Sequence, residues 1–244
     1  MKAAKATALF LMTPLYAGAA PGPHVARVTG QVTVLAAKSA QRSQRDERVA
    51  FWLKPLDAPS PVVLMVDGGH PHPRLIQRDK VFDPHILVVE VGSQVDFPNL
   101  DPFFHNVFSL FNGKRFDLGL YESGSTRAVR FDREGVCYIF CNIHPQMSAV
   151  VVVVDTPYFA VSDSRGEIAV RDVPPGRYQA KFWEEHCASK ALDDLSRNIT
   201  VSEGGVSVGT IQLQESEQPA TAHLNKYGKT YDPEVFESPL YTKP

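Results

Sequence analysis

Short apolar runs, rather than long amphipathic stretches, dominate the first two thirds of this chain. Several runs alternate apolar and polar residues with a period of two, which is typical of half-buried β-strands. The run SAVVVVV is rich in β-branched residues and predicts a buried strand rather than a membrane helix. Gly, Pro, Asn and Asp separate the runs, so we expect an all-β sandwich or barrel. The predicted strands cover residues 24–36, 49–56, 61–66, 85–97, 125–131, 135–141 and 148–154.

A second unit is predicted to begin near Asp155. Strands are expected on both sides of the turns SDSRGE (162–167) and VPPG (173–176), and two more around the pair Gly204–Gly205. This stretch resembles the small prealbumin-like sandwich of carboxypeptidase regulatory domains, whose recurrent turn is similar to VPPGRY. Polar loops are expected between the third and fourth of these strands, and no convincing helix is predicted.

The first residues, MKAAKATALFLMTPLYAGAAPGP, carry two lysines, an apolar core and then small residues. This order predicts a secretory signal peptide cut after Ala19. The apolar run is shorter than the ~18 residues that span a bilayer, so no membrane span is expected. The mature chain is therefore predicted to be periplasmic.

Composition narrows the function further. Hydrophobic residues make up 43% of the chain and aromatic residues 10%, which indicates a folded protein. The formal net charge of −2 argues against a nucleic-acid partner held through its phosphates. Three cysteines do not form a disulfide framework. A Cys137–Cys187 pair stays possible outside the cytoplasm.

The stretch FCNIHPQM (140–147) brings a thiol, an imidazole and a thioether together. A strand that ends at Cys141, followed by a tight loop, can direct the side chains of Cys141, His144 and Met147 to one point. His105, after the bend in VDFPNLDPFFH, can add a second imidazole. Two imidazoles, a thiolate and a weak axial thioether are the donors of type 1 copper. We therefore predict one copper ion per chain, cycling between Cu(II) and Cu(I).

The segments HNVFS (105–109) and GVCYIFCNIHPQM (135–147) resemble the cupredoxins over about residues 80–155. The loop length is similar to that of the amicyanin type. This resemblance implies a Greek-key β-sandwich with His105, Cys141 and His144 as equatorial ligands and Met147 as the axial one. The additional N-terminal residues and the second unit depart from amicyanin. The whole chain is more similar to two-domain periplasmic proteins grouped with methylamine utilisation.

Together these patterns divide the chain into four expected parts. The division is a signal peptide at 1–19, a cupredoxin-like copper domain with an N-terminal strand extension at 20–155, a small prealbumin-like sandwich at 156–214, and an extended surface tail at 215–244.

Three other interpretations of FCNIHPQM were weighed. Cys141 and Met147 could be ordinary core residues, because both types are often buried. A structural zinc site is disfavoured, since such sites use Cys and His rather than Met. Cys137 would create a binuclear copper motif, C-x3-C-x2-H-x2-M, but the strand GVCYIF leads into Cys141 and leaves Cys137 inside it. Cys137 is then expected in the core, on the same face as Cys141.

The leading functional hypothesis is a one-electron carrier with His144 as the exit ligand. Asn106 is expected to fix the ligand loop, and Pro145 to contribute to a docking patch for a redox protein such as a cytochrome c or a dehydrogenase. No catalytic constellation is found, so an enzyme is not expected. Copper storage or delivery, and a non-redox envelope interaction protein, remain as alternatives.

Overall fold

The computed structural model describes residues 25–37, 48–57, 71–110, 113–216 and 224–231. The predicted signal peptide and the strand expected at 61–66 lie outside these residues. The described chain consists almost wholly of strands, with one short helix, which confirms the all-β fold class. Within it, no helix has the length and apolar character needed to cross a membrane.

Strands β3 to β11 form one sandwich. Five of them build a sheet in the order β5-β11-β10-β7-β8, and the pairs β6-β9 and β3-β4 complete the layer opposite. The strands are β3 (Ile76–Arg78), β4 (Val81–Asp83), β5 (Ile86–Glu90), β6 (Gln94–Pro98), β7 (His105–Ser109), β8 (Phe116–Tyr121), β9 (Thr126–Arg130), β10 (Gly135–Cys141) and β11 (Ser148–Val154). We call this unit the first sandwich.

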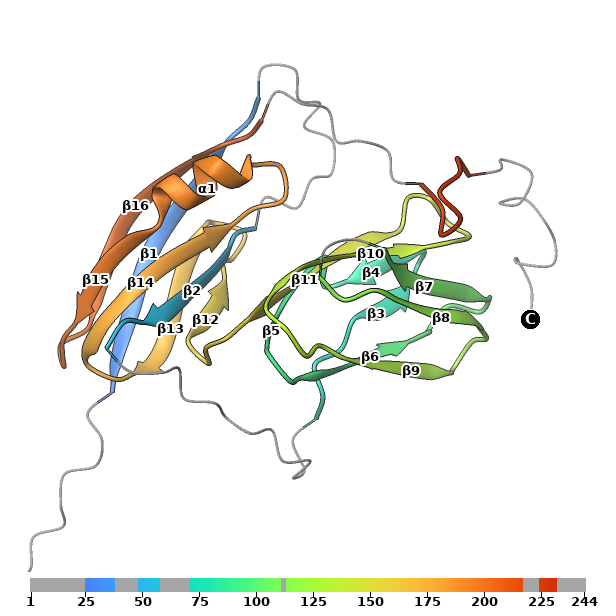
Figure 1. Cartoon of the computed structure of the whole chain (residues 1–244), viewed down its shortest axis with the longest axis horizontal. Helices are drawn as coiled ribbons and strands as arrows, with labels where there is room; N and C mark the ends of the chain where they lie inside the picture. The colour runs from blue at the N-terminus through green and yellow to red at the C-terminus, as the bar shows by residue number, and fades with distance from the viewer. Residues whose placement is uncertain (1–24, 38–47, 58–70, 111–112, 217–223, 232–244) are drawn as a thin grey trace, which may run out of the picture.

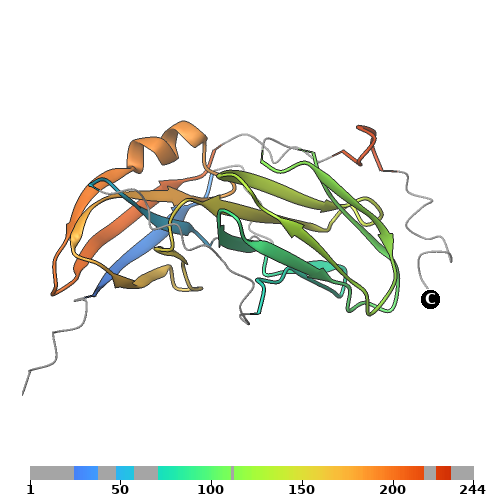
Figure 2. The same ribbon diagram turned by 60° about the horizontal axis from the view of Figure 1, so that its bottom comes forward.

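The second sandwich combines strands from both ends of the chain. Its sheets have the orders β13-β1-β16 and β12-β2-β14-β15. Its elements are β1 (Ala26–Leu35), β2 (Ala50–Pro55), β12 (Phe159–Val161), β13 (Glu167–Val173), β14 (Gly176–Trp183), α1 (Ser189–Leu195), β15 (Arg197–Val201) and β16 (Val206–Gln214). Figures 1 and 2 show the two sandwiches side by side, with the blue β1 and β2 among the orange and red strands.

The two N-terminal strands do not belong to the unit predicted for them from the sequence, which ends at residue 155. β1 pairs antiparallel with β13 and parallel with β16, and β2 pairs with β12 and β14. They therefore belong to the second sandwich and do not extend the first, contrary to the prediction from the sequence. The sequence gives no local sign that such distant segments pair in parallel. Alternation of apolar and polar residues shows which face of a strand is buried, but it does not show which strand lies beside it.

Two local expectations also change. The single strand expected at 85–97 is two strands, β5 and β6, because Gly92 turns the chain with a φ of 93° between them. Helix α1 occupies part of a segment expected to be polar loop. Its one buried side chain, Leu192, gives it too narrow an apolar face to stand out in the sequence. The five strands expected between 156 and 214 are all present.

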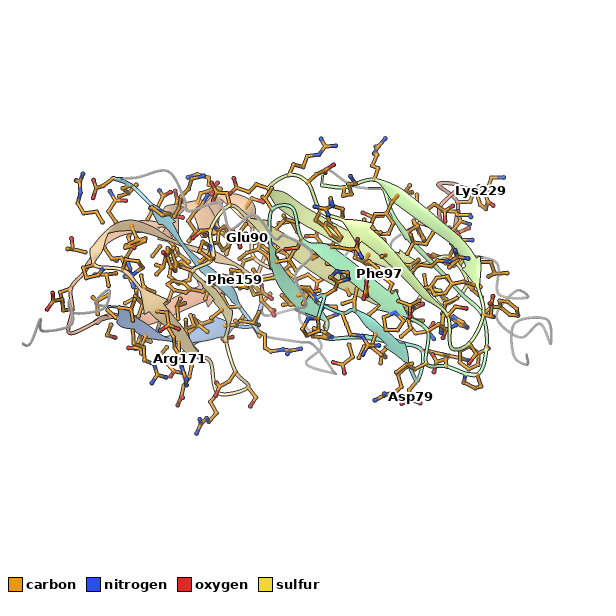
Figure 3. All side chains as sticks on the ribbon, turned by 90° about the horizontal axis from the view of Figure 1, so that it is seen from below. Asp79, Glu90, Phe97, Phe159, Arg171 and Lys229 are labelled. Atoms are coloured by element: carbon orange, nitrogen blue, oxygen red, sulfur yellow. The ribbon has the colours of Figure 1, made fainter. Side chains whose placement is uncertain are left out.

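One sheet separates two apolar cores. Along β11, Val150 and Val152 pack with the second sandwich, whereas Val151 and Val153 pack inside the first. Successive side chains of a strand point to opposite faces, so β11 is buried on both. This explains its unbroken run of valines. In Figure 3 the labelled Glu90 of β5 and Phe159 of β12 lie where the two sandwiches meet.

Val152 offers a test of this shared sheet. Val152→Thr keeps the shape of the side chain but buries a hydroxyl among apolar groups, so we expect the free energy of unfolding to fall by about 1–3 kcal/mol. Val81 is 51% exposed, and Val81→Thr serves as the control with little effect. Urea unfolding measures both. Equal stability of the two variants would contradict burial of β11 on its outer face.

Candidate metal centre

The pairing of β7 with β10 brings two of the predicted ligands together. Cys141, the last residue of β10, lies opposite Val107 in the antiparallel ladder. His105 begins β7 two positions before Val107, and therefore lies on the same face of the sheet. That face points into the first sandwich, where His105 and Cys141 are both 0% exposed.

A tight turn brings the third ligand back to the same point. The backbone N–H of Met147 donates to the carbonyl of His144 over 3.0 Å, and Cys141 N–H donates to the carbonyl of Met147 over 3.2 Å. Pro145 occupies the second position of the turn, where its fixed φ is favourable. The side chain of His144 is thereby directed inward and is 4% exposed.

Three donor atoms form a compact triangle. Cys141 Sγ lies 3.6 Å from His105 Nδ1 and 3.6 Å from His144 Nδ1, and the two nitrogens are 3.2 Å apart. A point equidistant from the three atoms lies about 2 Å from each, close to the metal–nitrogen bond lengths found in proteins. Among the described residues this is the one group of three or more His, Cys, Asp or Glu able to hold a metal ion. The geometry fits a metal ion at its centre.

Asp101 sets the protonation of His105. Its Oδ2 lies 2.8 Å from His105 Nε2, and both groups are buried. The hydrogen bond places the ring proton on Nε2 and leaves the Nδ1 lone pair directed at Cys141. Burial lowers the pKa of His105, while Asp101 opposes that change. The imidazole of His105 is therefore neutral.

Burial favours the neutral forms of the other two donors as well. Burial lowers the pKa of His144 to about 4, and the positive charge of Lys80 acts in the same direction. Burial raises the pKa of the Cys141 thiol, against hydrogen bonds from the backbone N–H groups of Asn106, Ile143 and His144. These N–H groups are positioned to stabilise the thiolate that forms when a metal displaces the thiol proton.

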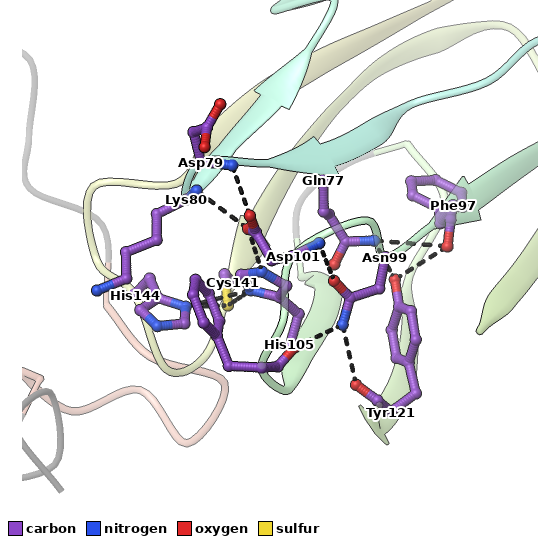
Figure 4. Close-up of polar contacts among 11 residues, drawn as sticks. Gln77, Asp79, Lys80, Phe97, Asn99, Asp101, His105, Tyr121, Cys141 and His144 are labelled. Atoms are coloured by element: carbon purple, nitrogen blue, oxygen red, sulfur yellow. Dashed lines mark hydrogen bonds and ion pairs between the residues drawn. The ribbon is translucent and has the colours of Figure 1, made fainter. Parts of the chain in front are cut away.

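A hairpin turn holds Asp101 in place. Asp79 and Lys80, at the β3–β4 turn, have φ of 55° and 57°, the left-handed region that β-hairpin turns of this length require. Their backbone N–H groups donate to the two carboxylate oxygens of Asp101 over 2.6 and 3.1 Å. The side chain of Asn99 accepts from Asp101 N–H and donates to Phe103 O. Figure 4 shows this chain of contacts ending at His105.

Phe103 covers the two imidazoles. Its ring centroid lies 5.3 Å from that of His105 and 5.6 Å from that of His144. Lys80 Nζ lies 5.3 Å from the Phe103 ring centroid. An aromatic ring therefore packs against both imidazoles, and a cation lies close to that ring.

The remaining predicted residues occupy places consistent with supporting roles. Asn106 donates to Asp117 Oδ1 over 2.7 Å, and its carbonyl accepts from Asn142 N–H over 3.0 Å. Met147 is fully buried in the same core as Cys141, and its axial role stays a prediction. Cys137 lies in that core as well, but outside the group of donor atoms. All three cysteines are free, so the possible Cys137–Cys187 disulfide is absent.

Sequence reasoning overlooked Asp101, Phe103 and Lys80. A signal existed for Asp101, since it precedes His105 by four residues in a Pro-containing bend. No comparable signal linked Lys80 to the site, because its position depends on the β3–β4 hairpin packing against the loop after β6.

Comparison with known proteins found similar solved structures but no matching family model or curated protein. Among solved structures, similar ones include a purple cupredoxin from Nitrosopumilus maritimus, 26% identical over 34% of this chain and 99% of its own, with a TM-score of 0.31. A copper-containing nitrite reductase from Thermus scotoductus is 24% identical over 41% of this chain and 27% of its own, with a TM-score of 0.34. A reduced amicyanin mutant is 20% identical over 43% and 98%, with a TM-score of 0.33.

Replacing Asp101 tests its effect on the metal ligand. Asp101→Asn removes the negative charge that orients His105, and we expect Cu(I) affinity to fall about 10- to 100-fold. Competition with a chromophoric Cu(I) chelator measures the change. Asp132→Asn, which removes an exposed carboxylate paired with Lys114, is the control. An equal loss of Cu(I) affinity in both variants would show that Asp101 has no special role at the site.

The lowered pKa of His144 predicts a pH effect on the metal-free protein. Its pKa falls from 6.5 to about 4 on folding, so between these pH values the unfolded chain binds a proton that the folded chain does not. This contribution to the free energy of unfolding is therefore fully present above about pH 6.5. It is lost as the pH is lowered to about 4, and the total loss is about 3 kcal/mol. Urea unfolding at several pH values should show this loss in the native chain and less of it in His144→Gln. If the stability of the native chain and of His144→Gln fell equally with pH, the lowered pKa of His144 would be refuted as the cause.

Proposed function

We propose that this chain is a periplasmic mononuclear type 1 copper protein that carries one electron at a time. The observation that carries the proposal is the triangle of one sulfur and two imidazole nitrogens. Two imidazoles and a thiolate in a trigonal arrangement, with a thioether near by in the sequence, suit copper better than zinc or magnesium. A bound copper ion would supply a one-electron change between Cu(II) and Cu(I).

The protein frame suits repeated electron transfer. His105 and Cys141 lie on paired strands, and a hydrogen-bonded turn fixes His144. Asp101 prevents rotation of the His105 ring. Because paired strands and a hydrogen-bonded turn hold the donors, little movement of the ligands is needed on a change of charge. Burial keeps water from the donor atoms and supports the neutral state of both imidazoles.

The predicted leader at 1–19 supports export to the periplasm, and we propose a carrier rather than an enzyme. His144 lies on a loop between strands, and we propose it as the route to a redox partner such as a cytochrome c or a dehydrogenase. Pro145, next to it, is proposed as part of the docking patch.

Copper loading of two cysteine variants tests the proposal. The native mature chain should bind one copper ion and show an intense thiolate charge-transfer band with a narrow copper hyperfine splitting. Cys141→Ala should abolish the band, because the thiolate is its source. Cys137→Ala is the matched control, because Cys137 lies in the same strand and the same core. This variant should retain the charge-transfer band.

Each other result has a definite meaning. Two copper ions sharing one unpaired electron, with loss of that signal in Cys137→Ala, would establish a binuclear centre. A band that survives Cys141→Ala would refute the ligand assignment. Copper bound without reversible electrochemistry, and lost readily to a Cu(I) chelator, would indicate storage or delivery instead.

A further inference from the structure

The residues Leu224–Tyr231, which we call the C-terminal clasp, form a compact turn far along the chain from the ligands. The side chain of Asn225 accepts from the N–H groups of Tyr227 and Lys229 over 3.0 and 3.1 Å. Backbone bonds join Asn225 N to Lys229 O and Gly228 N to Asn225 O, and Gly228 has a φ of 71°. These bonds give the clasp a defined shape. In Figure 1 it is the red segment beside the ends of β7 and β10.

Two direct hydrogen bonds join the clasp to the start of the ligand loop. The Tyr231 hydroxyl donates to the carbonyl of Cys141 over 2.8 Å. The backbone N–H of Lys226 donates to Asn142 Oδ1 over 2.9 Å. Asn142 N–H is held on its other side by the carbonyl of Asn106. The clasp therefore fixes the residue that carries the sulfur and the residue that follows it.

A third contact reaches the same loop through side chains. Lys226 Nζ lies 2.8 Å from Asp117 Oδ2, and Asp117 Oδ1 accepts from Asn106 Nδ2 over 2.7 Å. The carbonyl of Asn106 in turn accepts from the N–H of Asn142, the residue that follows Cys141. A continuous set of polar contacts thus runs from Lys226 to the residue next to the donor. The Lys226 ammonium is largely covered, with 20% of its side chain exposed.

We infer that Tyr231 and Lys226 are positioning residues, which hold Cys141 in its ligand geometry from outside the first sandwich. This inference rests on the proposed function for its copper readout but not for its readout on the free thiol. Tyr231 acts on the Cys141 carbonyl, and Lys226 acts through Asp117 and Asn106. The clasp also covers this carbonyl, which water would otherwise solvate.

The first test uses the metal-free full-length mature protein. The rate of alkylation by iodoacetamide is measured separately at each cysteine by peptide mass spectrometry. Loss of one hydrogen bond of ordinary strength favours opening of the loop about fivefold, so Tyr231→Phe should raise the rate at Cys141 about fivefold and leave Cys137 unchanged. Tyr227→Phe is the matched control, because Tyr227 is 71% exposed in the same turn.

Lys226→Ala provides a second variant that acts on the opposite end of the clasp. It removes the ammonium from Asp117 while keeping the backbone N–H of residue 226, so a smaller rise at Cys141 is expected. Urea unfolding of each variant distinguishes a local effect from loss of overall stability. Alkylation of Cys141 at the native rate in both variants would overturn the inference, and so would an equal rise at Cys137.

The copper-loaded protein gives the second readout. Tyr231→Phe should keep the thiolate band but lower the reduction potential, because water at the exposed Cys141 carbonyl favours the more highly charged Cu(II) form. A native potential in this variant would contradict the positioning role while the copper assignment stands. Absence of the band in the native protein would instead refute the proposed function, and the alkylation rates would still decide the role of the clasp.

Discussion

The antiparallel pairing of β7 with β10 is the constraint on which the site depends. It places Cys141 opposite Val107 and thereby sets His105 on the same face, inside the first sandwich. A shift of this register by one residue would direct one of these side chains to the opposite face. The turn at His144–Met147 then needs only to close back on β10 to complete the donor set.

The same sheet explains why the chain carries a second sandwich against the first. Val150 and Val152 of β11 would be exposed apolar surface if the first sandwich stood alone, and the second sandwich covers them. The face that carries His105 and Cys141 and the face covered by the second sandwich are thus the two faces of one set of strands. Hydrogen bonds to Asn99 and from the β3–β4 turn hold Asp101, and Asp101 in turn restrains His105 without a covalent link.

Local features could be predicted from the sequence, whereas contacts between distant segments could not. The spacing of Cys141, His144 and Met147 is a property of one loop, and short runs of apolar and β-branched residues identified β10 and β11. By contrast, β1 and β2 gave no sign of pairing with the second sandwich, since alternation does not specify a partner. Asp101 reaches His105 through a bend, and Tyr231 reaches Cys141 although β11 and strands β12 to β16 of the second sandwich lie between them in the sequence. Such contacts depend on the completed fold.

The most direct test of the central claim is X-ray absorption at the copper edge of the loaded mature protein. A mononuclear centre held by His105, Cys141 and His144 predicts two nitrogen neighbours and one short sulfur neighbour, all about 2 Å from copper. It also predicts no copper neighbour. A spectrum that requires a second copper, or one that contains nitrogen and oxygen but no sulfur, would contradict the account.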